Sequence, residues 1–105
     1  MTAIALDLSK LVTAEDIAAQ EALATASAIK AECRALILSV VDETAQANLL
    51  AAVAVGGLTE AQLETFASGV AWIAAMRAEC AARMAGEVGA WPAVPTGVAE
   101  LAAAF

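Results

Sequence analysis

Two long stretches without a helix breaker lie on either side of the glycine pair Gly56-Gly57. Thr13 precedes the first stretch as a candidate N-cap. Before the second, Thr59 and Gln62 have the spacing of a capping box, in which each side chain satisfies a backbone N–H of the other residue. A glycine pair is a typical C-terminal stop for a helix. Two helical arms joined by a short turn predict an antiparallel helical hairpin, and the expected fold class is all-α.

Further local signals mark where each arm breaks or ends. Asp42 offers a second N-cap inside the first arm, so this arm is expected to kink near Asp42. The second arm should cover residues 60–85 and stop at Gly86, where glycine can end a helix. Thr96 is predicted to cap a short C-terminal helix over residues 97–104.

Larger apolar residues recur on one face of each arm at the helical period. On the first arm these residues are Ile29, Cys33, Leu36, Ile37 and Val40. On the second arm they are Leu63, Phe66, Val70, Ile73, Cys80 and Met84. We expect these two stripes to face each other in the hairpin.

Three large apolar residues fall outside the two stripes. Leu38 lies on the polar side of the first arm, and Trp72 and Met76 flank the stripe of the second. Exposed apolar groups of this kind often mark interaction sites. Leu38, Trp72 and Met76 are therefore predicted interaction residues.

The two cysteines occupy matching positions on the two arms. Cys33 lies 24 residues before Gly57 and Cys80 lies 23 residues after it, so both should sit at the same height on facing stripes. One interpretation is a pair of small, buried apolar side chains. The other is a disulfide that forms once the protein reaches an oxidising medium. The sequence leaves both interpretations open.

Arg77 is the one charged residue in phase with the second stripe. A buried guanidinium needs a carboxylate partner. The nearest acids in height on the first arm are Asp42 and Glu43, which predicts a structural ion pair that fixes the kink to the hairpin. The alternative is an arginine whose aliphatic stem covers the stripe while its head reaches water.

The first residues of the chain follow a different period. Ile4, Leu6 and Leu8 alternate with smaller or polar residues, a pattern typical of a short strand. A strand without a partner in a helical chain either curls into the start of the following helix or adds to the sheet edge of another protein. Residues 1–12 are therefore predicted to be an extended docking segment, and residues 13–105 the helical domain.

Charge and composition exclude several classes of function. The chain has 5 basic and 12 acidic residues and a net charge of −7, so it lacks the clustered Lys and Arg of a nucleic-acid-binding surface. With no His and two Cys, a zinc site is not expected. No candidate nucleophile has a base beside it. We expect no catalytic residues, no metal and no cofactor, and hence no enzyme.

The sequence also gives an expectation about membranes and cellular location. The longest run without a charge, residues 44–59, is shorter than the roughly 20 apolar residues of a bilayer span. No signal-peptide pattern is recognisable at the N-terminus. The protein is expected to be made in the cytoplasm and not to associate with membranes.

Alanine dominates the hydrophobic content of the chain. Of the 105 residues, 62% are hydrophobic, and 31 residues are alanine, so few large side chains remain for a core. Association with another chain would bury apolar area that a monomer of this composition lacks. We therefore expect a homo-oligomer.

From Ala28 onward the chain resembles a group of short, uncharacterised proteins encoded among the tail and fibre genes of tailed phages and prophages of proteobacteria. The residues that carry the resemblance are Leu36-Ile37-Leu38, Gln46-x-Asn48-Leu49, Leu58-Thr59-Glu60-Ala61, Trp72-Ile73, Met76-Arg77-Ala78 and Trp91-Pro92 to Pro95. The group often has Pro-Glu-Trp where this chain has Asp42-Glu43-Thr44, which supports a helix break there. The group also has basic residues around the Gln-x-Asn where this chain has alanines, so no binding role of those residues carries over.

The resemblance implies a non-enzymatic component of a phage-like particle, in the tail, in a fibre or attached to the head, with no catalytic residues. Its partners would be other copies of itself and a larger phage structural protein, and its location the virion. The alternative is an assembly chaperone for a tail or fibre protein that is absent from the mature particle. A small regulatory protein or antitoxin of host origin is a third possibility, but the chain lacks the usual basic DNA-binding element.

Overall fold

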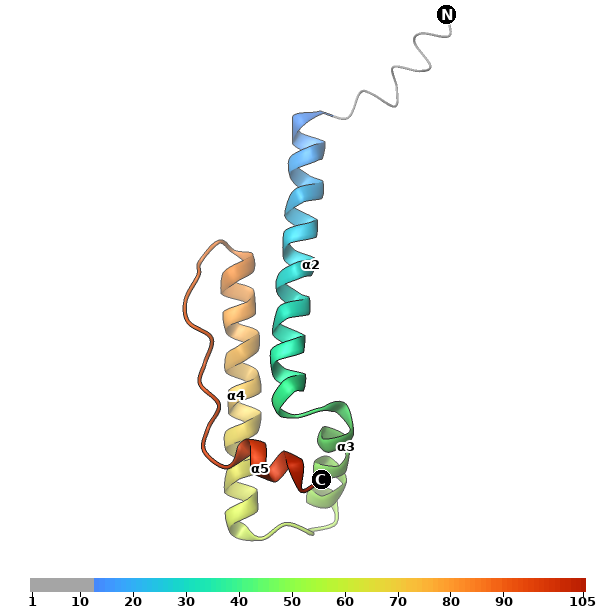
Figure 1. Cartoon of the computed structure of the whole chain (residues 1–105), viewed down its shortest axis with the longest axis vertical. Helices are drawn as coiled ribbons and strands as arrows, with labels where there is room; N and C mark the ends of the chain where they lie inside the picture. Colours follow the sequence, from blue (N-terminus) through green and yellow to red (C-terminus); the bar gives the residue numbers. More distant parts are fainter. Residues whose placement is uncertain (1–12) are drawn as a thin grey trace, which may run out of the picture.

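The computed structural model describes residues 13–105, and within this range it is all-α, with no strand (Figure 1). The helices are α2 (Ala14–Val40), α3 (Glu43–Ala54), α4 (Glu60–Met84) and α5 (Val98–Ala103). The predicted all-α fold class is therefore confirmed. The docking segment predicted at residues 1–12, with Ile4, Leu6 and Leu8, lies outside the described residues.

Capping side chains set the helix starts, as predicted. Thr13 forms a capping box at the start of α2, and its hydroxyl accepts from the backbone N–H of Asp16 at 3.1 Å. Thr59 and Gln62 form the predicted capping box of α4. The Asp42 carboxylate caps α3 by accepting from the backbone N–H of Ala45 at 2.7 Å. Each cap satisfies a backbone donor that the first turn of a helix leaves without an intrahelical partner.

Glycines in left-handed conformation follow α3 and α4. Gly56 has a φ of +67° and Gly86 a φ of +89°, values that glycine adopts without the steric cost of a Cβ. The predicted cap of the last helix is wrong. Gly97, and not Thr96, is the N-cap of α5; its φ is also +89°, and no side chain caps this helix.

The break near Asp42 is a sharp corner. The axes of α2 and α3 differ by 60°. The side-chain amide of Gln46 donates to the Val41 carbonyl oxygen at 2.9 Å, which satisfies a backbone acceptor that the corner leaves free. Arg34 in the last turns of α2 forms an ion pair with Glu43 at the start of α3, across the corner.

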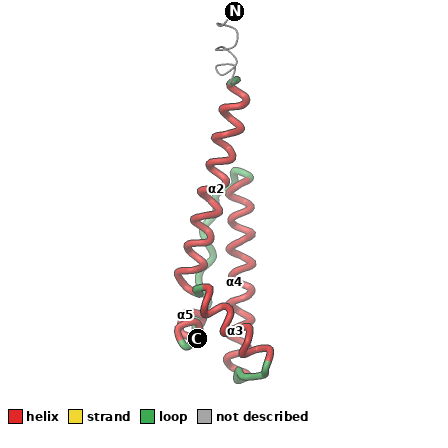
Figure 2. The backbone as a smooth tube through the Cα atoms, turned by 90° about the vertical axis from the view of Figure 1, so that its right-hand side faces the viewer, coloured by secondary structure: helices red, strands yellow, loops and turns green. Residues whose placement is uncertain are grey.

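The hairpin consists of α2 packed antiparallel against α4 (Figures 1 and 2). Because of the corner at Asp42, helix α3 does not continue the packing of α2 on α4. The C-terminal helix α5 instead packs against both α3 and α4. The lower core therefore combines residues from the corner, α3, the turn after it and α5: Val41, Ala45, Leu49, Leu58, Val98, Leu101 and Ala102.

A second core cluster lies between α2 and α4. Its buried members are Cys33, Ile37, Trp72, Met76 and Cys80. The stripe predicted for α2 is confirmed, since Ile29, Leu36 and Val40 also pack against this cluster. The stripe predicted for α4 is confirmed only in part: Phe66, Ile73 and Cys80 pack in the two clusters. Leu63, Val70 and Met84 are exposed, so the buried face of α4 is shifted from the predicted one.

The segment after α4 explains why the buried face of α4 differs from the predicted one. Residues 85–97 run back along α4 (Figure 1), and the Trp72 indole N–H donates to the Pro92 carbonyl oxygen at 3.1 Å. Glu79 accepts from the Gly89 N–H at 2.9 Å, and Arg83 donates to the Gly89 carbonyl oxygen at 2.7 Å. The side of α4 that carries Trp72 is therefore covered by the chain itself.

Candidate interaction surfaces

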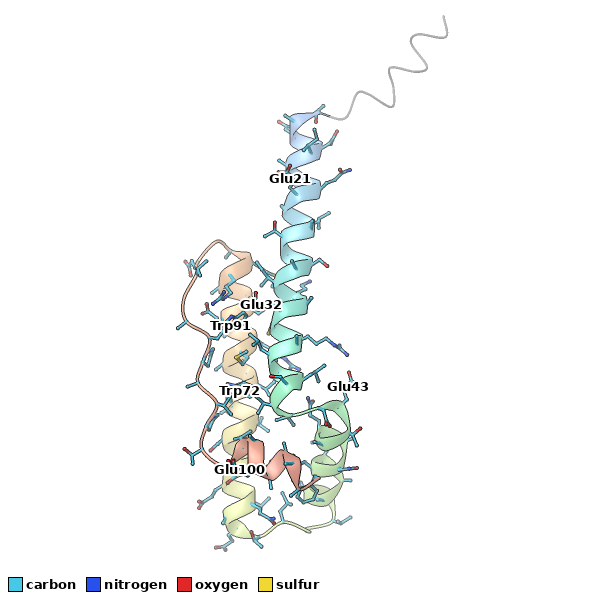
Figure 3. All side chains as sticks on the ribbon, viewed as in Figure 1. Glu21, Glu32, Glu43, Trp72, Trp91 and Glu100 are labelled. Carbon is cyan, nitrogen blue, oxygen red and sulfur yellow. The ribbon has the colours of Figure 1, made fainter. Side chains whose placement is uncertain are left out.

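The N-terminal half of α2 extends beyond every other helix of the described chain (Figures 1 and 2). All residues from Thr13 to Thr25 are exposed. Two large apolar side chains are among them, Ile17 at 47% and Leu23 at 72% exposure. Glu21 also lies on this part of the helix, away from the rest of the molecule (Figure 3). We call residues 13–25 the projecting segment.

The projecting segment continues the packed face of α2. Cys33 and Ile29 lie on the face that contacts α4, and at 3.6 residues per turn Ala26, Ala22 and Ala18 continue that face toward the N-terminus. Ala26 is half-buried, whereas Ala22 and Ala18 are exposed. The helix surface that α4 covers therefore extends beyond the end of α4 as an alanine stripe.

A groove with a basic rim lies where α2, the start of α3 and α4 meet. Its rim carries Lys30, Arg34 and Arg77, three of the five basic residues of the chain, and one acid, Glu43, which pairs with Arg34; Cys33 and Cys80 line its floor. We call this site the basic groove. In a chain with a net charge of −7, it concentrates positive charge on one side.

The ion pair predicted for Arg77 is wrong. Arg77 is exposed and forms no ion pair with any residue from 13 to 105. Both predicted partners have other roles, because Asp42 caps α3 and Glu43 pairs with Arg34. The exposure of Arg77 agrees with the alternative interpretation, in which the guanidinium reaches water.

The three predicted helical interaction residues differ in their surroundings. Leu38 is half-buried and lines the side of the basic groove. Trp72 and Met76 are 4% and 1% exposed, so the expectation that they lie on the surface of the chain is wrong. The error has the same cause as the misplaced stripe of α4, which is packed on two sides. Figure 3 shows Trp72 and Trp91 at different heights along α4.

A small apolar cavity of about 110 Å³ opens between α3, α4 and α5. Leu49, Phe66 and Val98 form its interior walls, and the exposed side chains of Leu50 and Val70 stand at its mouth. The polar side chains that line the cavity are those of Gln46 and Thr65. This cavity has the size of a few water molecules and the surface of an apolar pit, and it offers no charged group to a ligand.

The cysteine thiols are unpaired and buried. They lie in the same core cluster, which confirms the prediction that Cys33 and Cys80 meet at one height on facing helices. The Cys33 thiol donates to the Met76 carbonyl oxygen at 3.6 Å. Burial raises the pKa of the Cys33 thiol above its ordinary value of 9.0; the neighbouring Cys80 thiol raises this pKa further, and the positive charge of Arg77 acts in the opposite direction.

Three observations bear on the classes of site that the sequence excludes. Among residues 13–105, no three His, Cys, Asp or Glu side chains gather where they could hold a metal ion. No single helix in this range is long and apolar enough to cross a membrane. By length and composition, α2 and α3 meet that requirement only when taken together across their bend.

Comparison of the chain with family models, with curated proteins and with solved structures gives no match. The projecting segment and the basic groove are therefore interpreted from their own geometry. The sequence contains a signal for the first, since Ile17 and Leu23 stand alone among alanines, but the second could be found only once the corner at Asp42 was known.

Proposed function

We propose that this protein is a non-enzymatic interaction protein that assembles through the projecting segment of α2. The observation that carries the proposal is the unbroken helix from Ala14 to Thr25, of which every residue is exposed. These residues extend about 18 Å beyond the packed part of α2 at 1.5 Å per residue. An isolated helix of this length is marginal in water even when it is rich in alanine. A partner that packs on this segment would supply the missing stabilisation.

A second copy of the same chain is the partner that the segment fits best. The alanine stripe continues the face with which α2 already packs on α4, and small side chains allow two helix backbones to approach closely. Glu15 and Asp16 lie at the start of the segment and Lys30 just beyond its end. In an antiparallel pair of projecting segments, the acidic start of each copy would point toward the end of the other copy's segment, which Lys30 follows.

Light scattering combined with size-exclusion chromatography tests this mode of association. Leu23→Glu places a charge on the most exposed large apolar residue of the segment and is expected to shift the protein to a monomer. Val55→Glu is the matched control, because Val55 is 82% exposed at the opposite end of the molecule, and it should leave association unchanged. The same molar mass for wild type and Leu23→Glu would contradict the proposal, provided that circular dichroism shows equal helicity.

The resemblance to short proteins of phage tail and fibre gene regions suggests the kind of particle in which this protein assembles. We propose that the protein is a component of a phage-like particle, with a larger structural protein as its second partner. Mass spectrometry of purified particles should find the protein at a fixed copy number. Its absence from complete particles, together with its presence in lysates, would favour an assembly chaperone.

A further inference from the structure

Two thiols from opposite arms of the hairpin meet at the floor of the basic groove. Cys33 on α2 and Cys80 on α4 belong to one buried cluster and both line the groove. They are 5% and 7% exposed, and the Cys33 thiol donates to the backbone carbonyl oxygen of Met76, one turn before Cys80 on α4. Met76, which is 1% exposed, packs in the same cluster and helps fix the two helices against each other. Folding therefore brings together two sulfur atoms that are 47 positions apart in the sequence.

We propose that Cys33 and Cys80 are a redox-active pair that closes to an intramolecular disulfide on reaction with a small anionic disulfide, such as oxidised glutathione. This inference is independent of the proposed function. It assigns the basic groove as the entry site of the oxidant, because the groove is where both cysteines meet the surface.

The reaction proceeds by two successive thiol–disulfide exchanges. One cysteine loses its proton to solvent, and its thiolate attacks a sulfur of oxidised glutathione, which forms a mixed disulfide and releases one glutathione thiolate. The second cysteine loses its proton, attacks the protein sulfur of the mixed disulfide and releases the second glutathione thiolate. Both released thiolates take up protons. The two cysteines lose two electrons in total, and oxidised glutathione is reduced to two molecules of glutathione.

The rim of the groove matches the charge of this oxidant. Lys30 and Arg77 line it together with the Arg34–Glu43 ion pair, so the lining keeps a net positive charge. Oxidised glutathione has four carboxyl groups and two amino groups and is therefore negatively charged near neutral pH. Positive charge at the mouth of a groove raises the local concentration of an anion. The charge of Arg77 also favours the thiolate of Cys33 and opposes the effect of burial on its pKa.

Disulfide formation would join α2 to α4 and close a long loop that contains the whole α3 region. A cross-link over a loop of this length restricts the unfolded chain, so the melting temperature is expected to rise by about 10–20 °C. Reduction would remove this gain.

The test uses the full chain, reduced with a phosphine that is then removed, and incubated in its folded state with oxidised glutathione. Intact mass spectrometry should show the loss of two hydrogens, non-reduced peptide mapping should show a Cys33–Cys80 cross-link, and the melting temperature should rise. Cys80→Ser is the matched control, and it should stop at a glutathione adduct on Cys33 without the thermal gain. The proposal is overturned if the folded chain gives only adducts, intermolecular dimers or unreacted thiols.

A second comparison tests the role of the rim. Arg77→Gln should slow closure by oxidised glutathione by about threefold or more and leave closure by the neutral 2-hydroxyethyl disulfide nearly unchanged. Raising the salt concentration should reduce the difference between wild type and variant for the anionic oxidant. Equal slowing with both oxidants, or none with either, would remove the groove from the mechanism.

Discussion

The packing of α2 on α4 depends most on Met76, which is the largest fully buried side chain in residues 13–105, at 1% exposure. Met76→Ala removes three heavy atoms from the cluster that includes Trp72 and Ile37. At about 0.8 kcal/mol per buried methylene-sized group, the transfer part alone costs about 2.4 kcal/mol. The cavity left behind adds to this loss, since measured Met-to-Ala substitutions in cores cost about 2–5 kcal/mol. We expect the free energy of unfolding to fall by about 3 kcal/mol.

The assay is equilibrium unfolding in urea, followed by circular dichroism at the helical minimum. Met84→Ala is the matched control, because it makes the same change in the same helix at a side chain that is 39% exposed, and it should cost less than about 1 kcal/mol. The measurement is repeated at two protein concentrations, since a contribution of Met76 to an oligomer interface would vary with concentration. Equal losses for the two variants would refute the buried position of Met76.

Three further predictions concern charged and titratable groups. Arg77→Met should change the free energy of unfolding by less than about 0.5 kcal/mol, because the guanidinium is exposed, and a larger loss in urea unfolding would restore the ion-pair interpretation. Arg83→Gln removes the cation that lies 4.1 Å from the centre of the Trp91 ring and should speed proteolysis within residues 85–97, while unchanged cleavage would contradict a role for Arg83 in holding this segment. The raised pKa of Cys33 contributes stability that is present below the ordinary thiol value of 9.0 and is lost as the pH rises through the higher folded value, so melting temperatures above pH 9 should fall less in Cys33→Ala than in wild type.

The sequence predicts the helix boundaries well because their causes are local. Thr13, Asp42 and Thr59 each cap a helix through a bond to a backbone N–H three residues away, a distance that the sequence itself fixes. Gly56 and Gly86 likewise mark helix ends through their own backbone conformation. None of these features requires knowledge of what packs against the helix.

The buried face of α4 could not be predicted in the same way. The period of its apolar residues is compatible with a face centred on Val70 or one centred on Met76, and the choice depends on where residues 85–97 run. The path of residues 85–97 is set by the hydrogen bonds that Arg83 and Trp72 donate to their backbone. No local sequence pattern predicts these contacts. For the same reason, the sequence predicted an ion pair for Arg77 that the structure of residues 13–105 does not contain.

The continuity of α2 links its two halves thermodynamically. The C-terminal half is held by α4, whereas the projecting segment has no cover from residues 13–105 and retains helical geometry through its capping box and its connection to the packed half. A partner that binds only the helical form of the projecting segment must stabilise that form by its binding free energy. A disulfide between Cys33 and Cys80 would fix the packed half and reduce the ordering that remains for the partner to impose. Because such coupling is reciprocal, association through the projecting segment should also favour the disulfide over the two free thiols at equilibrium.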